Sequence, residues 1–530
     1  MKYVIRTYPK QILLFSVLSV ILAILNVSNA LVLQLMMNVA TKKSSLSYSF
    51  LVLIVISYII INAIFYYFQQ YNSEYLAKKS ISLYRNIIFE RISAQRISSF
   101  TKKDSGEYIS LMTSQMDTLE QNYFTAIFWG SYLLIQFITA CIVAFFINPV
   151  MALVAIILSI PNMFLPLLFR KVLEKTTIKT VKATDTYISK ISDYLKGFVD
   201  WKINGGSSFV KKQEKSANKT LLANQKNEVR AMNLSTVFNN TFSNILYLGT
   251  WLIGSFLILN KSMTVGAIVA FSQLVTNISF PIYSFSDMFS QIVSGKKLFK
   301  EIESSFVNVK KNNPEIQTIS DFKNIKFDNV SVVYNSERVV KIGNLEISND
   351  KKYVIHGPSG SGKTTLFKLL TKQILDYQGS ILFNNINIKK IKDNSIFSQV
   401  SYLPQSGHIF STTLINNLTL FNTEKYPKED LFKVLRFVEL RKWANEEELY
   451  RKIDPQKISG GEAKRIELAR LLLDKKNILI LDEFSSGLDE VTRHKIESKL
   501  FNLESTILYI THNLDDELRE KADKIIEIKK

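Results

Sequence analysis

The chain has 530 residues, too many for a single hydrophobic core, so at least two domains are expected. Lys and Arg (66) outnumber Asp and Glu (46), which gives a net charge of +20. Such an excess is typical of nucleic-acid-binding proteins, and also of membrane proteins with basic cytoplasmic loops. The single cysteine, Cys141, excludes an internal disulfide and lies in an apolar run, where we expect a small buried side chain.

Long uncharged segments in the first half of the chain decide between these classes. A membrane-spanning helix needs about 20 apolar residues. The segments therefore predict six spanning helices, and they exclude a basic nucleic-acid-binding ATPase. Asn148-Pro149 suits a tight turn between the third and fourth of them. The helices are expected at residues 11–40, 46–73, 121–147, 149–170, 231–260 and 263–286.

The longest of these runs exceed the thickness of a bilayer. Thirty residues make a helix of about 45 Å at ~1.5 Å per residue, against a hydrocarbon core of about 30 Å. We therefore expect the helices to project beyond the membrane. Scattered polar residues within them either line a path or form hydrogen bonds between helices, and we favour the second role. These polar residues are Asn26, Asn29, Gln34, Gln136 and Asn277.

The loops differ in charge, which predicts the orientation of the helices. Residues 74–120 carry seven Lys and Arg, and residues 170–230 carry fourteen. The opposite loops hold only Lys42, Lys43 and Lys261. By the positive-inside rule both long loops and both chain termini are cytoplasmic, in a multi-pass protein of the cell membrane. The composition, rich in Lys, Ile and Asn, suggests a bacterial source.

The two long loops show helical periodicity rather than the pattern of a solvated loop. Leu83, Ile87, Ile88 and Ile92 keep three- and four-residue spacing. Each loop is therefore predicted to be a cytoplasmic helical hairpin whose tip touches a soluble domain. Gly106 in the first, and Gly205-Gly206 in the second, are the expected points of chain reversal.

The second half of the chain contains a phosphate-binding loop. Its eight residues fit the pattern G-x-x-x-x-G-K-[ST] between an apolar strand, Tyr353–His356, and a helical run. The glycines let several N–H groups face one anion, and the helix N-terminus adds partial positive charge. We expect Lys363 to reach the β- and γ-phosphates of a nucleoside triphosphate, and the Thr364 hydroxyl to bind Mg²⁺.

Two further motifs follow downstream. The aliphatic run Ile478–Leu481 ends in two acids, of which Asp482 is expected to hold Mg²⁺ through water and Glu483 to polarise a water as general base. Ser459, Gly460 and Gly461 open a helical run and offer a hydroxyl and bare N–H groups to a second anion.

Taken together, these motifs resemble an ATP-binding cassette (ABC) half-transporter of the exporter type. The resemblance covers nearly the whole chain. It implies an all-α six-helix membrane domain (residues 1–302), a linker (303–324) and a P-loop α/β nucleotide-binding domain (325–530). Ser105–Ser110 resembles the sequence just after the first coupling helix of this family, and Thr264–Phe271 resembles the start of the sixth span.

The resemblance implies a role for each motif residue. Residues implied to bind ATP are Tyr334, Gly357, Pro358, Ser359, Gly360, Ser361, Gly362, Lys363, Thr364, Thr365, Gln405, Ser459, Gly460 and Gly461. Those implied to bind Mg²⁺ are Thr364, Gln405 and Asp482, and the catalytic residues are Glu483, His512 and Lys363. Tyr334 would stack on adenine, His512 would contact the γ-phosphate, and Ser486–Asp489 would cross between two cassettes.

Three features depart from the family pattern. Glu462 stands where the signature usually has Gln, which places a carboxylate near a triphosphate. Residues 451–457 lack the Gly-Glu pair found in many exporters, and the stretch between Gln405 and Ser459 is short. These departures bear on how the cassette contacts the coupling helices.

The function implied is an ATPase that drives a peptide or hydrophobic small molecule out of the cell by alternating access. A dimer of half-transporters is required, as a homodimer or a heterodimer. Alternatives on the same fold are an importer of a metal–chelate complex or other small molecule, and an ATP-gated regulatory membrane protein. Because no cysteine-protease domain precedes the first helix, an exporter with a built-in leader-cleaving domain is not expected.

Overall fold

The computed structural model describes residues 2–307, 317–334, 338–358, 360–511 and 514–528. The chain divides into two compact units. The first comprises Met1–Arg91 and Ser105–Phe306, and the second comprises Ile92–Asp104 and Val307–Lys530. The first predicted hairpin therefore contributes its tip to the second unit.

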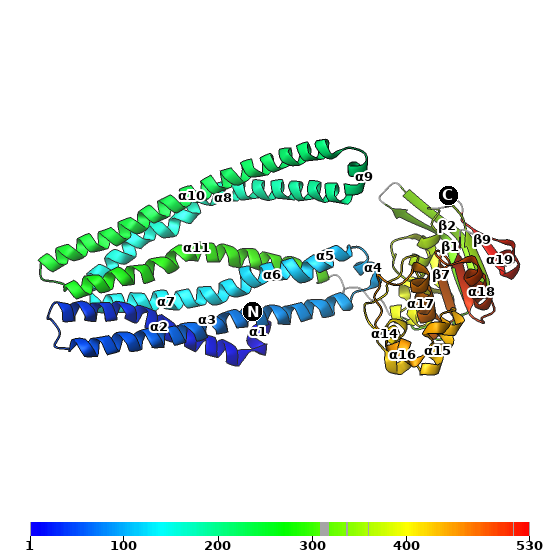
Figure 1. Ribbon diagram of the computed structural model, residues 1–530, viewed down its shortest axis with the longest axis horizontal. Helices are drawn as coiled ribbons and strands as arrows, with labels where there is room; N and C mark the ends of the chain where they lie inside the picture. The colour runs from blue at the N-terminus through cyan, green and yellow to red at the C-terminus, as the bar shows by residue number, and fades with distance from the viewer. Residues whose placement is uncertain (1, 308–316, 335–337, 359, 512–513, 529–530) are drawn as a thin grey trace. The chain divides into compact units, whose positions relative to one another are not determined.

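The first unit is built from long helices (Figure 1). Ser105–Ile147 is one continuous helical segment that includes two π-helical stretches, η1 and η2. In Figure 1, α8 and α10 run side by side and are joined through the short helix α9. The elements are α1 (Lys2–Thr7), α2 (Pro9–Ala40), α3 (Tyr48–Ser93), α5 (Ser105–Ser110), η1 (Leu111–Gln115), α6 (Met116–Leu119), η2 (Glu120–Thr125), α7 (Ala126–Ile147), α8 (Pro149–Lys196), α9 (Phe198–Ile203), α10 (Ser207–Leu259) and α11 (Val265–Val307).

Five helical segments of the described residues are long and apolar enough to cross a membrane. They are Pro9–Ala40, Tyr48–Ser93, Ser105–Ile147, Ser207–Leu259 and Val265–Phe306. Each overlaps one of the predicted spans, and most extend well beyond it. The remaining span, residues 149–170, lies at the start of α8, whose apolar part within the described residues is the shorter Pro149–Pro161. A sixth crossing at this position stays a prediction.

The turn predicted at Asn148-Pro149 is present. The Asn148 side chain caps α8 by accepting a 3.0 Å hydrogen bond from the backbone N–H of Met151, and Pro149 stands at the first helical position. Proline suits this position because its missing N–H would have no partner within the helix.

Replacing Asn148 by Ala should lower stability by about 1 kcal/mol, because one backbone donor of α8 loses its acceptor. The thermal midpoint in detergent should fall by a few degrees. Asn148→Ser is the matched control, since serine is an equally good cap and should leave the midpoint unchanged. Equal midpoints for the Ala and Ser variants would contradict the capping role.

Polar side chains connect helices inside the first unit. Asn26 Nδ2 donates to the Tyr132 hydroxyl (2.7 Å), and Asn62 Nδ2 donates to Asn26 Oδ1 (3.1 Å). Gln136 Nε2 donates to Asn277 Oδ1 at 3.1 Å. These bonds join α2, α3, α7 and α11, so the helix-to-helix role predicted for Asn26, Gln136 and Asn277 is confirmed.

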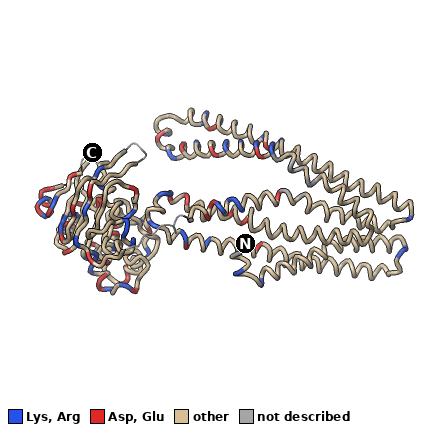
Figure 2. Tube along the Cα trace, turned by 180° about the vertical axis from the view of Figure 1, so that it is seen from behind, with Lys and Arg blue, Asp and Glu red and all other residues tan. Residues whose placement is uncertain are grey.

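The two hairpins reverse close to the predicted places, with one correction. Gly205, at φ +76°, lies in the turn between α9 and α10, as expected. Gly106 does not mark the first reversal, because it lies inside α5, and the chain turns between Ser93 and Ser105 instead. In Figure 2 charged residues gather on the parts of α8 and α10 next to α9, which agrees with a cytoplasmic hairpin.

The second unit consists of two β-sheets with surrounding helices. One sheet is antiparallel, in the order β2-β1-β4-β5, and the other is parallel, in the order β6-β7-β8-β3-β9. Every residue of the central strands β7 and β8 is buried, as expected for a sheet covered on both faces. The strands are β1 (Asn324–Tyr334), β2 (Arg338–Ser348), β3 (Lys352–His356), β4 (Gln378–Phe383), β5 (Ile386–Asn387), β6 (Val400–Leu403), β7 (Ile478–Asp482), β8 (Thr506–Ile510) and β9 (Lys524–Glu527).

The helices of this unit include one that lies outside the predicted soluble domain. This is α4, at the tip of the first hairpin, where Arg96 Nε lies 3.7 Å from Asp393 Oδ2. The predicted contact between that tip and a soluble domain is therefore present. The helices are α4 (Ile97–Phe100), α12 (Lys363–Leu370), η3 (Ile388–Lys390), α13 (Asp393–Phe397), α14 (Leu414–Thr419), η4 (Thr423–Lys425), α15 (Lys428–Phe437), η5 (Arg441–Trp443), α16 (Glu446–Tyr450), α17 (Gly460–Leu473), α18 (Glu490–Phe501) and α19 (Asp516–Lys521).

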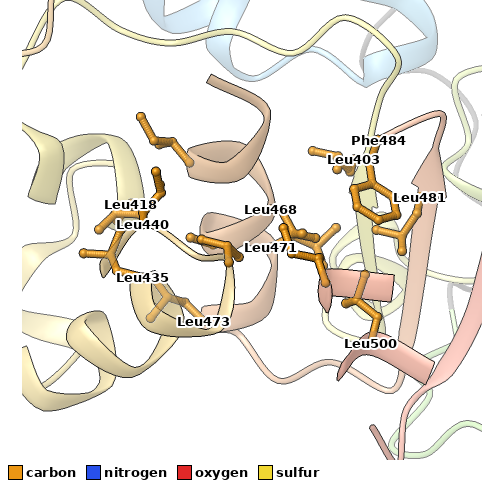
Figure 3. Packing of buried hydrophobic residues seen from close by; sticks show 14 of the residues in the cluster. Leu403, Leu418, Leu435, Leu440, Leu468, Leu471, Leu473, Leu481, Phe484 and Leu500 are labelled. Atoms are coloured by element: carbon orange, nitrogen blue, oxygen red, sulfur yellow. The ribbon is translucent and has the colours of Figure 1, made fainter. Parts of the chain in front are cut away.

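The largest core of the second unit surrounds α17. Leu468 and Leu471 of this helix pack toward Leu481 and Phe484, and Leu473 packs toward Leu435 (Figure 3). The helix thus joins the parallel sheet to the small helices α14 to α16. At the other end of the unit, β1 begins at Asn324, one residue before the predicted boundary. Within the predicted linker (303–324), residues 308–316 lie outside the described residues.

Candidate functional site

The predicted phosphate loop connects β3 to α12. Gly362, at φ +107°, occupies the left-handed region, and a Cβ there would lie 2.1 Å from Cγ1 of Val340, so only glycine fits. The side chain of Lys363 is buried, and its Nζ donates to the carbonyls of Gly357 (2.7 Å) and Pro358 (3.1 Å). The loop thus keeps an ammonium group within its own curve, where an anionic phosphate would bind. Ser359 lies outside the described residues.

Asp482 ends the buried strand β7 and is itself only 1% exposed. Within the described part of the chain, neither of its carboxylate oxygens accepts a hydrogen bond of good geometry, although the Thr364 hydroxyl lies nearby. Burial raises the pKa of this carboxyl, the Thr364 hydroxyl opposes the rise, and the charge of Glu483 adds to it. A buried carboxylate without well-placed donors is unfavourable unless a cation balances it, so the residues present fit Mg²⁺.

Glu483 follows Asp482 in a backbone conformation that side-chain-bearing residues seldom adopt. Its φ is +52°, in the left-handed region, and its N–H donates to Ile510 O on the neighbouring strand β8. Gln405, just after β6, donates from Nε2 to Glu483 Oε2 at 2.8 Å. Gln405, predicted as a metal ligand, and Glu483, predicted as the general base, are therefore in contact at the carboxyl end of the parallel sheet.

Tyr334 also reaches the phosphate loop, from the end of β1. Its hydroxyl lies 3.3 Å from Oγ1 of Thr365, and its ring is partly buried. This places an aromatic ring beside the loop, where a nucleobase could stack. The structure therefore brings together Tyr334, Lys363, Gln405, Asp482 and Glu483, which lie on four different segments of the sequence. His512 lies outside the described residues.

The signature residues stand at the N-terminus of α17. The Ser459 hydroxyl donates to Glu462 Oε2 (2.9 Å) and accepts from the Glu462 N–H, while the Ser459 N–H donates back to the same carboxylate. This is a capping box, and its backbone hydrogen bond lowers the pKa of the Glu462 carboxyl. A Cβ on Gly461 would lie 2.9 Å from Gly487 O, so the signature packs closely against the predicted crossing loop.

Two charged residues that the sequence reading missed lie next to Gln405. Lys464 Nζ donates to Pro404 O (3.0 Å) and lies 3.1 Å from Glu467 Oε2, and both side chains are largely buried. The signal in the sequence was available: Lys464 and Glu467 interrupt the apolar face of a helix that is otherwise buried at Ile466, Leu468 and Ala469.

Comparison with known proteins identifies the two units. Residues 12–282 match the family described as the ABC transporter transmembrane region, which is more than half of the chain, and residues 340–486 match the ABC transporter family. The chain belongs to the ABC transporters. The predicted superfamily and the order of the two fused domains are confirmed, and the family is one of ATP-binding proteins that couple ATPase activity to transport.

Relatives of this ABC transporter include an exporter-type protein along its whole length. The ATP-dependent lipid A-core flippase of Desulfotalea psychrophila is 26% identical over 98% of the chain and 92% of its own length. The lactococcin-A transport/processing ATP-binding protein LcnC of Lactococcus lactis subsp. lactis is 29% identical over 52% of the chain, and the match spans only 39% of LcnC. A similar Lactococcus lactis protein is matched over 42% of its length.

The fold of this ABC transporter matches that of a solved exporter. A bacterial Atm1-family ABC exporter with ATP bound superimposes with a TM-score of 0.78, covering 99% of this chain and 94% of the other, at 17% sequence identity. The predicted fold class, a helical membrane domain followed by an α/β nucleotide-binding domain, is thereby confirmed.

Proposed function

We propose that this ABC transporter hydrolyses ATP to move a peptide or a hydrophobic small molecule out of the cell. The observation that carries the proposal is the cluster around the phosphate loop. A buried ammonium at Lys363, a buried carboxylate at Asp482 and a second carboxylate at Glu483 converge at one end of the sheet. This is the arrangement that phosphoryl transfer to water requires.

The residues of the chain act mainly by position and charge. Lys363 would neutralise charge on the β- and γ-phosphates, and the Tyr334 ring would hold adenine. Glu483 would orient a water toward the γ-phosphate, and His512 would contact that phosphate. Thr364, Gln405 and Asp482 would hold Mg²⁺, which supplies further neutralisation of phosphate charge when bound. The hydrogen bond from Gln405 keeps the Glu483 carboxylate oriented.

The working unit would be a dimer of half-transporters in the cell membrane, with both termini in the cytoplasm. Gly461 packs against its own crossing loop at Gly487, and the N-terminus of α17, which Ser459 and Glu462 cap, would face a nucleotide on a second cassette. ATP would then be sandwiched between the phosphate loop of one chain and the signature of the other. Closure of the cassettes would move the membrane helices between two arrangements, in an alternating-access cycle.

Two observations support the nature of the cargo. The helices offer a largely uncharged interior, in which the described polar contacts are neutral amide and hydroxyl groups such as Asn26, Tyr132 and Gln136. Relatives carry names that refer to a peptide (lactococcin) or a lipid. A peptide or hydrophobic molecule fits both.

The test is ATP hydrolysis by the full chain in lipid nanodiscs, with and without Mg²⁺, and with lactococcin-type peptides or lipid A-core lipids added. We expect Mg²⁺-dependent hydrolysis that one of these two compound classes stimulates. Chain that binds ATP in a thermal-shift assay but never hydrolyses it alone would point to a heterodimer, which co-purified partner subunits would reveal. Chain that neither binds nor hydrolyses ATP would refute the proposal.

A further inference from the structure

Two side chains of α17 form hydrogen bonds with the two ends of an exposed four-residue stretch. The stretch is Gln405–His408, which follows strand β6. Lys464 Nζ donates to Pro404 O, just before it, at 3.0 Å. Arg470 donates from Nη1 and Nη2 to His408 O, at its far end, at 3.2 Å. Two cations on a single helix therefore fix the backbone on either side of Gln405.

Glu467 fills the space between these two cations. It is only 5% exposed, and its carboxylate lies under the backbone of Gly407. A Cβ on Gly407 would lie 2.1 Å from Cδ of Glu467, closer than any real side chain could come. The φ of Gly407 is outside the left-handed region, so a side chain here would not strain the backbone but would force the Glu467 carboxylate or the stretch to shift.

The Lys464–Glu467 pair is poorly explained as a device for stability. Two buried charges lose hydration on folding, and a pair of apolar residues of the same size is commonly as stable or more stable. We expect the pair instead to orient the Lys464 ammonium toward the backbone before Gln405. Glu467 holds the Lys464 ammonium at 3.1 Å, and the same ammonium then donates to Pro404 O.

Gln405 is the residue whose position depends on this attachment. Its Nε2 lies 2.8 Å from Glu483 Oε2, so a shift of about 1 Å in the stretch would lengthen or break that hydrogen bond. The N-terminus of α17, two turns or less from Lys464, carries the signature residues Ser459–Gly461. One rigid helix thus connects the signature of this chain to the side chain that touches its own general base.

We propose that Lys464 and Glu467 are positioning residues that hold residues 404–408 on α17 and thereby set the place of Gln405 beside Glu483. A displacement of the signature helix, when it engages a second cassette, is then transmitted to the hydrolytic site of the same chain. The inference rests on the proposed ATP hydrolysis. It adds a mechanical connection between the signature helix and the hydrolytic site of the same chain, which the proposed function treats as independent.

The test replaces both charges with side chains of similar shape, Lys464→Met together with Glu467→Gln, so that the net charge of the cluster is unchanged. In the full-length protein we expect the amides of residues 405–408 to exchange hydrogen at least about tenfold faster, because one end of the stretch is released. We expect kcat for ATP to fall about tenfold while KM for ATP stays within about twofold, since the nucleotide contacts are untouched. Lys464→Arg, which keeps a donor for Pro404 O, should stay within about twofold of the unmodified chain in both.

A matched control comes from a similar pair elsewhere in the domain. Lys499 Nζ lies 2.6 Å from Glu439 Oε1, and removing it with Lys499→Met and Glu439→Gln should leave both exchange at 405–408 and kcat unchanged. If the main double variant does not fold, Gly407→Ala tests the same contact with both charges in place. The added methyl would separate the Glu467 carboxylate from the stretch, because one of the two must move, and the same effects are expected.

Three results decide the inference. Unchanged exchange at residues 405–408 in the double variant, or in Gly407→Ala if that is the variant that folds, would overturn it. A fall in thermal midpoint with kcat intact would also overturn it, because it would mean a purely structural role. An unmodified chain without ATPase activity would count against the proposed function alone, since hydrogen exchange reports on the attachment without catalysis.

Discussion

Glu483→Gln should bind ATP as tightly as the unmodified chain and hydrolyse it at least about 100-fold more slowly, the range for loss of a positioned general base. Glutamine has almost the same shape, and its side-chain oxygen can still accept the hydrogen bond from Gln405 Nε2, now 2.8 Å from Glu483 Oε2. The phosphate loop and Asp482 are untouched, so nucleotide affinity has no reason to change. What is lost is the negative charge that orients and deprotonates water.

The measurement is kcat from steady-state hydrolysis, with the ATP dissociation constant from equilibrium titration of the same preparation. Glu490→Gln is the matched control, because Glu490 is an exposed acid on the neighbouring helix α18, with 81% of its side chain accessible. Its kcat should be unchanged. A Glu483→Gln chain that keeps kcat within a few-fold of the unmodified value would remove Glu483 from the role of base.

Much of the architecture could be predicted because the signals were local. A helix in a bilayer must satisfy its own backbone, so uncharged runs translate directly into helices, as with α2 and α7. The turn at Asn148 was equally local, because a capping side chain and a proline at the first helical position act within four residues. The phosphate loop is a strand, a glycine-rich turn and a helix in sequence order, and the structure places them so.

The wrong prediction arose where a single residue suggested a turn inside a segment whose overall pattern is helical. Gly106 suggested a reversal, but one glycine costs a helix only about 1 kcal/mol, and α5 absorbs it. The chain turns instead near Arg96, where α4 packs in the second unit. The helical periodicity of residues 83–92 was, by contrast, interpreted correctly, because α3 continues to Ser93 and projects beyond the predicted end of the span at residue 73.

Contacts between distant segments were the least predictable part of the site. The pattern of α17 shows that Lys464 and Glu467 interrupt an apolar face, but nothing in one sequence shows that Gly407 lies against Glu467. Glu462 is a different case. It was interpreted as a carboxylate near a triphosphate, although Ser459 three residues before it already forms the sequence pattern of a capping box, which the structure contains.

Asp482→Asn should change stability and catalysis in opposite directions. The carboxylate is 1% exposed, and burial raises its pKa although the Thr364 hydroxyl and the charges of Lys363 and Lys464 oppose the rise, so in metal-free protein it is a buried charge that is only partly compensated. Asparagine keeps the volume and removes the charge. The metal-free variant should therefore melt at the same temperature as the unmodified chain or a few degrees higher, because burying a poorly compensated charge is unfavourable.

In the presence of Mg²⁺ and ATP the order of stability should reverse. The unmodified chain gains stability from Mg²⁺-ATP by mass action, whereas the variant loses the carboxylate that holds the cation and should gain little. Its kcat should fall by at least about 100-fold, since charge neutralisation at the phosphates is a leading contribution to the rate. Thermal melting with EDTA, with ATP alone and with Mg²⁺-ATP separates the two effects. The control is Asp454→Asn, a half-exposed acid in the same domain, which should behave as the unmodified chain throughout. An Asp482→Asn variant that is less stable than the unmodified chain in EDTA would mean that protein groups stabilise the Asp482 carboxylate. An unchanged stabilisation of the variant by Mg²⁺-ATP would mean that other residues hold the cation.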